Sequence, residues 1–109
     1  MKSRSDFAVA IRISEFMKIE PKFPLGRIVA TPGALAALER ANQTPLEFLA
    51  RHATGDWGEV CDGDKKLNDE ALIQGERMLS SYSTGKGEKV WVITEADRSA
   101  TTLLLPEEY

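Results

Sequence analysis

The sequence predicts an α+β fold in which helices precede an antiparallel sheet. Two helix starts in the first half of the chain place a proline directly after a threonine, at Thr31-Pro32 and Thr44-Pro45, and this pairing is typical of an N-cap followed by the first helical residue. From Arg77 onwards, short apolar runs alternate with glycine-rich or charged turns, as in consecutive hairpins. Helices that come before the hairpins, instead of alternating with strands, indicate the α+β class.

The first half of the domain is expected to contain a short strand and two helices. The run "RIVA" predicts a strand at Arg27–Ala30, and a helix follows over 32–41. A second helix is predicted over 45–54, because Thr44 and Glu47 have the spacing of a capping box. Its apolar face is expected to comprise Leu46, Leu49, Ala50 and Ala53.

A third helix is predicted over 64–74. Gly55 is expected to end the second helix, and a loop then leads to Asp64, which can cap the third. Gly75 is expected to stop it. Helical spacing directs a set of apolar side chains toward the core: Leu67, Ala71 and Leu72.

Three short strands are predicted over 77–105 as an antiparallel meander. Their sequences are "RMLSSYS", "EKVWVIT" and "ATTLLLP", with turns at 84–87 and 95–99. The middle strand is apolar on both faces, which is typical of a central strand covered on both sides. One face carries Val90 and Val92, and the other carries Trp91 and Ile93. We expect the helices to cover one face and the N-terminal segment the other.

A single domain is expected over 26–109, after a variable, partly flexible extension over 1–25. A chain of 109 residues with 42% hydrophobic residues suffices for one small domain with a real core. Within the extension, the stretch Glu20-Pro21-Lys22-Phe23-Pro24 has the two prolines of an extended linker.

Charge is unevenly distributed along the chain. Residues 1–27 hold six basic and three acidic residues, so this stretch carries +3 and the remainder −6, against a net charge of −3 for the whole chain. An acidic body disfavours broad contact with a phosphate backbone, so a protein partner is expected, and nucleic acid could make only a weak contact with the basic stretch. No apolar run could span a membrane, and a single cysteine, Cys61, agrees with the reducing cytosol.

The only histidine, His52, stands in "RHATGDWGEV", at the predicted end of the second helix. Its ordinary pKa lies near neutrality, so it could act as a general acid or base. The favoured alternative is a capping histidine at the edge of the core, since cations are common in a last helical turn. Asp56 could orient His52 or hold the turn. Trp57 could offer a stacking surface for a base, although a cover over the core is favoured.

A second polar cluster, with Glu95, Asp97 and Arg98, follows the middle strand. Such a turn is usually held by its own ion pairs and Asx-type hydrogen bonds, and this interpretation is favoured. The functional alternative uses Arg98 as an anion clamp, with the two carboxylates taking part in binding. If the meander folds under the helices, four side chains could line one cleft at the edge of the sheet: His52, Arg77, Tyr82 and Arg98. Such a composition is suited to metal-independent cleavage of a phosphodiester.

No metal site or cofactor is expected. Asp62-Gly63-Asp64 begins like a calcium loop, but Leu67 stands where the sharp-turn glycine belongs and Ile73 where the bidentate acid belongs. A zinc site needs more ligands than one histidine and one cysteine. The chain also has no glycine-rich phosphate loop.

Three stretches of the chain resemble a family of small bacterial proteins found on plasmids and other mobile elements. They are "GRIVATPGALAALERANQTPLEFLARHATGDWGEV", "NDEALIQGERMLSSY" and "VWVITEADRSATTLLLPEEY". The resemblance covers about 26–109 and is specific at His-x-x-Gly-Asp-Trp-Gly and Ile-Thr-Glu-Ala-Asp-Arg-Ser. Some members are labelled type I restriction endonuclease subunit M, but this chain is too short for a methyltransferase and lacks a cofactor-binding glycine loop. The resemblance therefore implies a bacterial accessory protein.

Two functional hypotheses remain open. The leading hypothesis is a non-enzymatic accessory or inhibitory protein that binds another macromolecule. The second is a metal-independent ribonuclease, because helices followed by a meander resemble in outline the barnase and RelE group of small nucleases. In that mechanism His52 would transfer the proton, and Arg77 and Arg98 would hold the phosphate. Tyr82 or Asp56 would orient the reacting groups.

Overall fold

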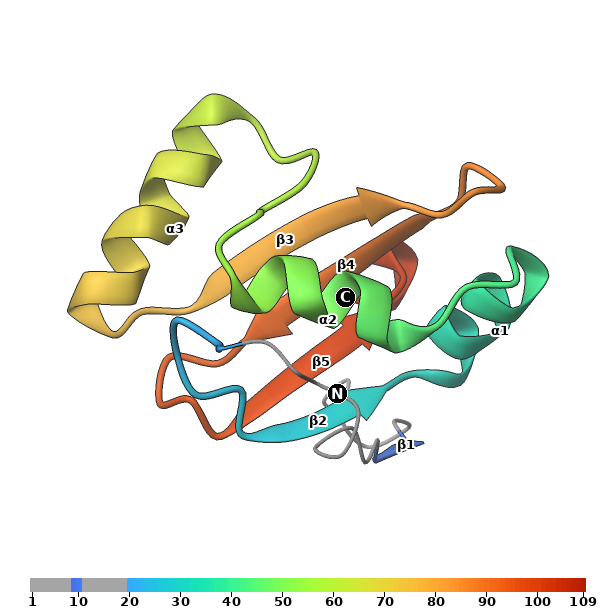
Figure 1. Cartoon of the computed structure of the whole chain (residues 1–109), viewed down its shortest axis with the longest axis horizontal. Helices are drawn as coiled ribbons and strands as arrows, with labels where there is room; N and C mark the ends of the chain where they lie inside the picture. Colours follow the sequence, from blue (N-terminus) through green and yellow to red (C-terminus); the bar gives the residue numbers. More distant parts are fainter. Residues whose placement is uncertain (1–8, 11–19) are drawn as a thin grey trace.

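One mixed sheet and three helices make up the computed structural model, which describes residues 9–10 and 20–109. The strands are β1 (Val9–Ala10), β2 (Arg27–Ala30), β3 (Met78–Ser83), β4 (Lys89–Thr94) and β5 (Ala100–Leu104). The helices α1 (Pro32–Arg40), α2 (Pro45–Ala53) and α3 (Asp62–Gln74) separate β2 from β3, and a 3-10 turn, η2 (Pro106–Glu108), follows β5 (Figure 1).

The α+β class is confirmed, but the sheet is mixed and not purely antiparallel. β3, β4 and β5 pair antiparallel as the predicted meander. β2 joins β5 in parallel, with Arg27 opposite Ala100 and Ala30 opposite Leu103. The strand order is β1-β2-β5-β4-β3, so β5 lies in the centre of the sheet. A parallel pair needs a long crossover, and the helices together with the first hairpin provide it.

The first two helices begin where the Thr-Pro pairs predict, although by different means. In α1 the Thr31 hydroxyl accepts a hydrogen bond from Ala34 N at 3.1 Å, as an N-cap should. In α2 the predicted capping box is wrong, because Thr44 makes no side-chain capping bond. The Glu47 carboxylate instead accepts a hydrogen bond from the side chain of Gln43, at 3.0 Å from Gln43 Nε2.

The third helix begins earlier than predicted, and the apolar face expected for it is confirmed only in part, since Ala71 is buried and Leu72 is partly buried. α3 starts at Asp62, so the assignment of Asp64 as its N-cap is wrong. Leu67, expected in the core, is 60% exposed, whereas Asn68 and Ala71 are buried. The physical reason is that this helix packs beside the open edge of β3, where a polar amide is needed more than an apolar side chain.

The outer edge of β3 is closed by side-chain and loop hydrogen bonds. The Asn68 amide donates to Leu79 O at 2.8 Å and accepts from Leu79 N at 3.1 Å, as a neighbouring strand would. Further along, Ser81 N donates to Trp57 O at 3.1 Å, and Ser81 O accepts from Glu59 N at 2.6 Å. These bonds cover an edge that could otherwise pair with another chain.

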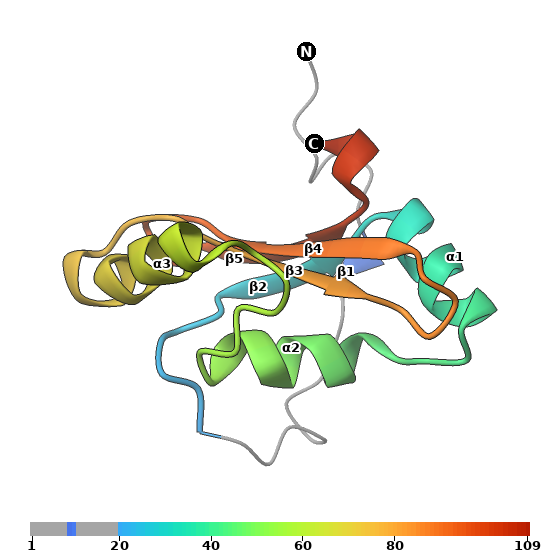
Figure 2. The ribbon, with the colours of Figure 1, turned by 90° about the horizontal axis from the view of Figure 1, so that it is seen from above.

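Figure 2 shows α2 against one face of the sheet and η2 on the other. Beneath α1 and α2 lies a core cluster whose buried members are Ala30, Ala34, Ala37, Leu38, Phe48, Leu49, Tyr82, Val90, Val92 and Leu103. A second cluster comprises Phe23, Leu25, Ala53, Trp57, Ala71 and Met78. The packed core therefore includes Phe23 and Leu25, which the predicted boundary placed in the N-terminal extension.

The second face of the sheet is also apolar and buried. Its buried side chains are Val29, Ile93, Thr102 and Leu104. With Val90 and Val92 buried on the first face, β4 is covered on both sides as predicted. The expectation that the N-terminal segment supplies the second cover lies outside the described residues. Within the described part of the chain, no helix has the length and apolar character needed to cross a membrane.

Candidate functional site

The stretch from Arg51 to Gly58 begins at the end of α2, which turns His52 into the protein. Four residues of this nine-residue helix are buried: Phe48, Leu49, His52 and Ala53. They recur at helical spacing, so His52 continues the stripe that packs on the sheet. Its exposed fraction is 0%. The histidine is thus a core residue and not an edge residue at the surface.

Both ring nitrogens of His52 contact buried hydroxyl groups. Nδ1 lies 2.5 Å from Ser80 Oγ on β3, and Nε2 lies 2.9 Å from Thr94 Oγ1 on β4. Thr94 Oγ1 lies 2.7 Å from Thr101 Oγ1 on β5, and Thr101 donates to Leu25 O at 2.7 Å. We call this chain of hydrogen bonds the His52 chain. It ties α2, three strands and the segment before β2 to one another.

Counting hydroxyl protons assigns a direction to the His52 chain. Thr101 has one proton and donates it to a carbonyl, so it must accept from Thr94. Thr94 has then used its own proton, so it accepts from His52 Nε2–H. This leaves Nδ1 as the acceptor of the Ser80 hydroxyl proton. The chain is complete with a neutral imidazole, and a second ring proton would find no acceptor in that arrangement.

Aromatic rings enclose the same histidine. The Phe23 and Trp57 rings meet His52 edge to face, with centroids 5.4 and 5.6 Å away. Burial in this environment lowers the pKa of His52 from 6.5 to about 3. A general acid or base must reach the substrate and titrate near the working pH. His52 as placed here meets neither condition.

Acidification is expected to destabilise the protein through His52. The unfolded chain takes up a proton at this residue below pH 6.5, while the folded chain does so only near pH 3. Stability that is complete above pH 6.5 is therefore lost progressively between 6.5 and 3. At pH 5 the loss is on the order of 2 kcal/mol. Denaturant unfolding at pH 7 and pH 5 measures it.

His52→Gln is the control for this pH dependence, since it keeps one donor and one acceptor but does not titrate. Its free energy of unfolding should be nearly the same at pH 7 and pH 5, and equal pH dependence in both proteins would contradict the assignment. A hydrogen bond from a neighbouring side chain is the main cause of a lowered pKa at four carboxylates: Asp56, Glu59, Glu88 and Asp97. These groups titrate at lower pH than an unfolded histidine does.

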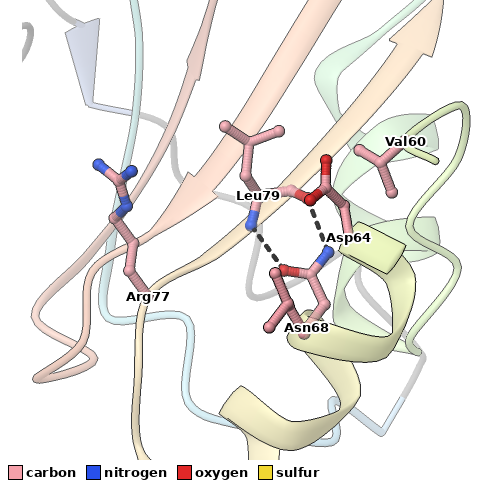
Figure 3. A pocket seen from close by; sticks show the side chains of 6 residues that line it. Val60, Asp64, Asn68, Arg77 and Leu79 are labelled. Carbon is pink, nitrogen blue, oxygen red and sulfur yellow. Dashed lines mark hydrogen bonds between the residues drawn. The ribbon is translucent and has the colours of Figure 1, made fainter. Parts of the chain in front are cut away.

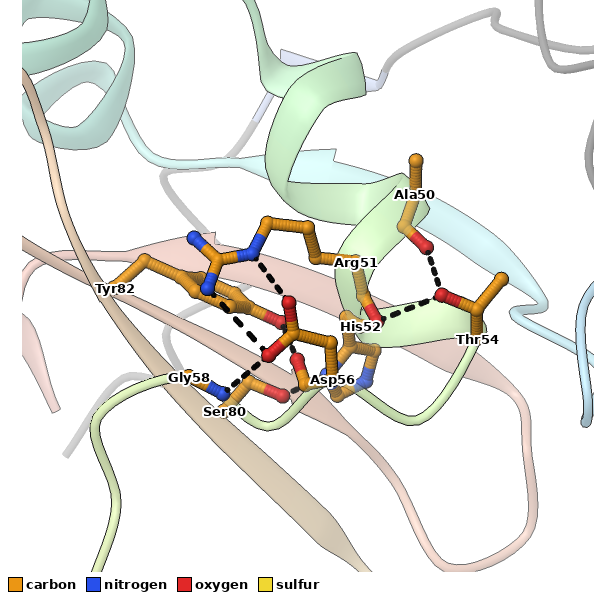
Figure 4. Close-up of polar contacts among 8 residues, drawn as sticks. All are labelled: Ala50, Arg51, His52, Thr54, Asp56, Gly58, Ser80 and Tyr82. Carbon is orange, nitrogen blue, oxygen red and sulfur yellow. Dashed lines mark hydrogen bonds and ion pairs between the residues drawn. The ribbon is translucent and has the colours of Figure 1, made fainter.

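Asp56 holds the turn after α2 and makes its hydrogen bonds away from His52 (Figure 4). Its carboxylate accepts from Arg51 Nε at 2.7 Å and from Gly58 N at 3.1 Å. The Tyr82 hydroxyl donates to Asp56 O at 2.6 Å, and the Arg51 guanidinium lies 4.5 Å from the centroid of the Tyr82 ring. Burial raises the pKa of Tyr82, so its hydroxyl stays protonated and serves this bond. These contacts fix the loop on β3.

Trp57 covers the core, as the favoured interpretation holds. Its side chain is 3% exposed, and its ring is stacked on Phe23 with centroids 6.3 Å apart. The indole Nε1 donates to Asp69 Oδ1 at 2.9 Å, which connects the loop to α3. A ring enclosed in this way has no free face for a nucleic-acid base.

Arg98 is a structural connector between two parts of the chain. Its guanidinium donates to Ala71 O at 2.9 Å, at the end of α3, and to Glu76 O at 2.7 Å. It also donates to Glu95 O and Ala96 O, both at 3.2 Å, within its own turn. An anion clamp needs donors that face solvent, and here both terminal nitrogens of the guanidinium donate to backbone carbonyls.

The other polar candidates of the second cluster lie at the surface. The Asp97 carboxylate accepts from Ser99 N at 3.0 Å, which is the expected Asx-type bond. Glu95 N donates to Ala100 O at 3.0 Å across the hairpin. Arg77 donates to the Tyr109 hydroxyl, and its guanidinium lies 5.3 Å from the Tyr109 ring centroid. No hydrogen bond, ion pair or ring contact among residues 20–109 joins Arg77 or Arg98 to His52.

The sequence did not predict the hydroxyl partners of His52: Thr94 and Thr101 were assigned only to the second polar cluster, and Ser80 to no site. Ser80, Thr94 and Thr101 stand at inward positions of three neighbouring strands, where an apolar side chain is the usual occupant. The sequence does indicate that Ser80 is buried, because it lies two residues from both Met78 and Tyr82 and therefore on the same face of the strand. Among residues 20–109, no group of three histidine, cysteine or acidic side chains is arranged to hold a metal ion.

Comparisons with known proteins find no matching protein-family model, no significantly similar curated protein and no significantly similar solved structure. The resemblance to small plasmid-borne bacterial proteins therefore stays a prediction. The analogy to the barnase and RelE group likewise remains untested.

Proposed function

We propose that the protein is a small, non-enzymatic accessory protein that binds another macromolecule, and that it belongs to the mobile-element family its sequence resembles. The observation that carries this proposal is the enclosure of His52. It is the only histidine of the chain, its exposed fraction is 0%, and both of its nitrogens are occupied by hydroxyl groups. Without it, a metal-independent ribonuclease has no acid or base that titrates near neutrality.

The remaining ribonuclease candidates also have structural contacts. Asp56 pairs with Arg51, and Arg98 is held by four backbone carbonyls. Tyr82 is buried and donates to a carbonyl oxygen. Each of these groups stabilises a turn or a strand in the folded protein. The net charge of −3 further favours a protein partner over a phosphate backbone.

The protein would act in the cytosol. An inhibitory role has a simple physical basis, because an acidic surface can cover a basic, nucleic-acid-binding surface of a partner. Cys61 is exposed and forms no disulfide, which agrees with a reducing compartment. The accessory role itself comes from the sequence resemblance at Gly26–Val60 and in the C-terminal half.

Purified protein is expected to cleave no RNA in the presence of EDTA. The comparison is between wild type and Arg77→Gln, a surface substitution that leaves the buried core unchanged. A mock purification from the same host measures contaminating nuclease. EDTA-resistant cleavage by the wild type that is lost in Arg77→Gln would overturn the proposal.

A pull-down from bacterial lysate tests the proposed binding function directly. Recovery of no protein partner at low or moderate salt would count against the proposal.

A further inference from the structure

A pocket of about 230 Å³ lies between α3 and β3 (Figure 3). Its lining is mixed: Val60, Leu67 and Leu79 are apolar, whereas Asp64, Asn68 and Arg77 are polar or charged. An apolar cavity of about 150 Å³ is enough to admit benzene. The pocket therefore has room for one side chain of the size of leucine or phenylalanine.

Large apolar and aromatic side chains are exposed beside this pocket. Leu67 lines the pocket and is 60% exposed on α3, so its side chain is accessible to a partner. On the other side of the pocket, the Arg77 guanidinium lies over the Tyr109 ring, which is 54% exposed. The Tyr109 ring also meets the Trp91 ring edge to face, with centroids 5.7 Å apart. Tyrosine, tryptophan and arginine are the residues enriched where binding energy concentrates in protein interfaces.

The backbone beside the pocket cannot accept an added strand. Asn68 occupies both the N–H and the carbonyl of Leu79, and the loop residues Trp57 and Glu59 occupy those of Ser81. Strand addition needs such groups to be free. A partner at this place therefore binds through side chains and not by strand addition.

The surroundings of the pocket are acidic. Residues 59–77 hold six acidic and three basic residues. Glu59 is paired with Lys89 and Asp69 with the Trp57 indole. The other four acidic residues of this stretch take part in no ion pair among the described residues: Asp62, Asp64, Glu70 and Glu76. Complementary charge across an interface selects the partner and speeds association.

We propose that this pocket receives one apolar side chain presented by a basic segment of another protein. The inference rests on the proposed binding function and assigns to it a site and a partner chemistry. Leu67 and Leu79 contact the apolar anchor, and the acidic residues of α3 attract the basic residues on either side of it. Arg77 and Tyr109 form the far rim.

The test uses synthetic peptides as probes and methyl NMR signals as the readout. The probe is a short lysine-rich peptide with one central leucine, and two matched peptides replace either the leucine by alanine or the lysines by glutamate. We expect the first probe to shift the methyl signals of Val60, Leu67 and Leu79. Each replacement should weaken binding about tenfold or more, and added salt should weaken it further.

Two variants on the same helix separate the pocket from the rest of α3. Leu67→Ser removes a pocket wall, while Ile73→Ser removes a side chain that is 87% exposed and does not line the pocket. Both positions are exposed, so both variants should fold. Binding of the leucine peptide is expected to fall about tenfold or more in Leu67→Ser and to be unchanged in Ile73→Ser.

Several results would overturn this inference. The first is that the leucine peptide shifts none of the methyl signals. The second is that this peptide binds equally well to Leu67→Ser and Ile73→Ser. The third is that the alanine or the glutamate peptide binds the wild type as tightly as the leucine peptide does. Shifts of the same methyl groups by a single-stranded RNA would assign the pocket to nucleic acid, and self-association that Leu67→Ser abolishes would assign it to a second copy. None of these peptide results depends on catalysis, whereas the proposed function is overturned separately by EDTA-resistant RNA cleavage.

Discussion

Replacing His52 by alanine is expected to lower the free energy of unfolding by about 4 kcal/mol. The substitution empties a fully buried site between Phe23, Trp57 and the sheet. It also removes the acceptor of the Ser80 proton and the donor to Thr94. Urea unfolding at pH 7, where the histidine is neutral in both states, measures the loss.

His52→Phe separates the two contributions to that loss. Phenylalanine is somewhat larger than histidine, so it leaves no cavity, but it gives the hydroxyl groups of Ser80 and Thr94 no nitrogen partner. Its cost should therefore be smaller, about 2 kcal/mol. An exposed helix-end histidine would instead contribute about 1 kcal/mol or less. A loss of that size in His52→Ala would restore the capping interpretation and contradict the buried chain.

Gly58→Ala is the second substitution with a large expected effect, about 4 kcal/mol of unfolding free energy. The residue has φ +74°, which is costly for alanine, and an added Cβ would lie 2.0 Å from Ser81 O. The methyl group would push the loop away from β3 and break the bond from Glu59 N to Ser81 O. Thermal or denaturant unfolding of the purified variant tests this.

Gly75→Ala is the matched control, because Gly75 has the same φ of +74° but no atom within 4 Å of an added Cβ. Its free energy of unfolding should fall by only about 1 kcal/mol, because alanine at positive φ strains the backbone but meets no neighbouring atom here. The difference between the two variants isolates the close approach of the loop to β3. Equal losses would mean that the loop can yield, and that the contact with Ser81 contributes little.

Local signals in the sequence predicted most of the elements. A proline after a threonine starts α1 and α2, and Gly75 ends α3 in a left-handed conformation. Such signals act within a few residues, so they need no knowledge of the rest of the fold. The pairing of β2 with β5 has no local signal, because Arg27 meets Ala100 only after the whole helical region has folded back.

The site residues were harder to interpret than the elements. His52 follows Phe48 at helical spacing, which pointed to burial, but a polar residue near Gly55 also fits a helix end. The deciding information lay in Ser80 and Thr94, which reach it only through the sheet. Similarly, Asn68 is buried where the apolar pattern favours Leu67, because an open strand edge needs a donor and an acceptor.

The position of β5 has a consequence for how the chain matures. β5 is the central strand of the sheet and follows the other four described strands in the sequence, so the ribosome makes it after them. Until it emerges, β2 on one side and the β3–β4 hairpin on the other have no common partner. Synthesis that stops before residue 100 would leave two half-sheets with unpaired inner edges, which are sites of aggregation. A chain that includes β5 can join β2 to the β3–β4 hairpin, whereas a fragment that stops before β5 leaves both inner edges open to pairing with other chains.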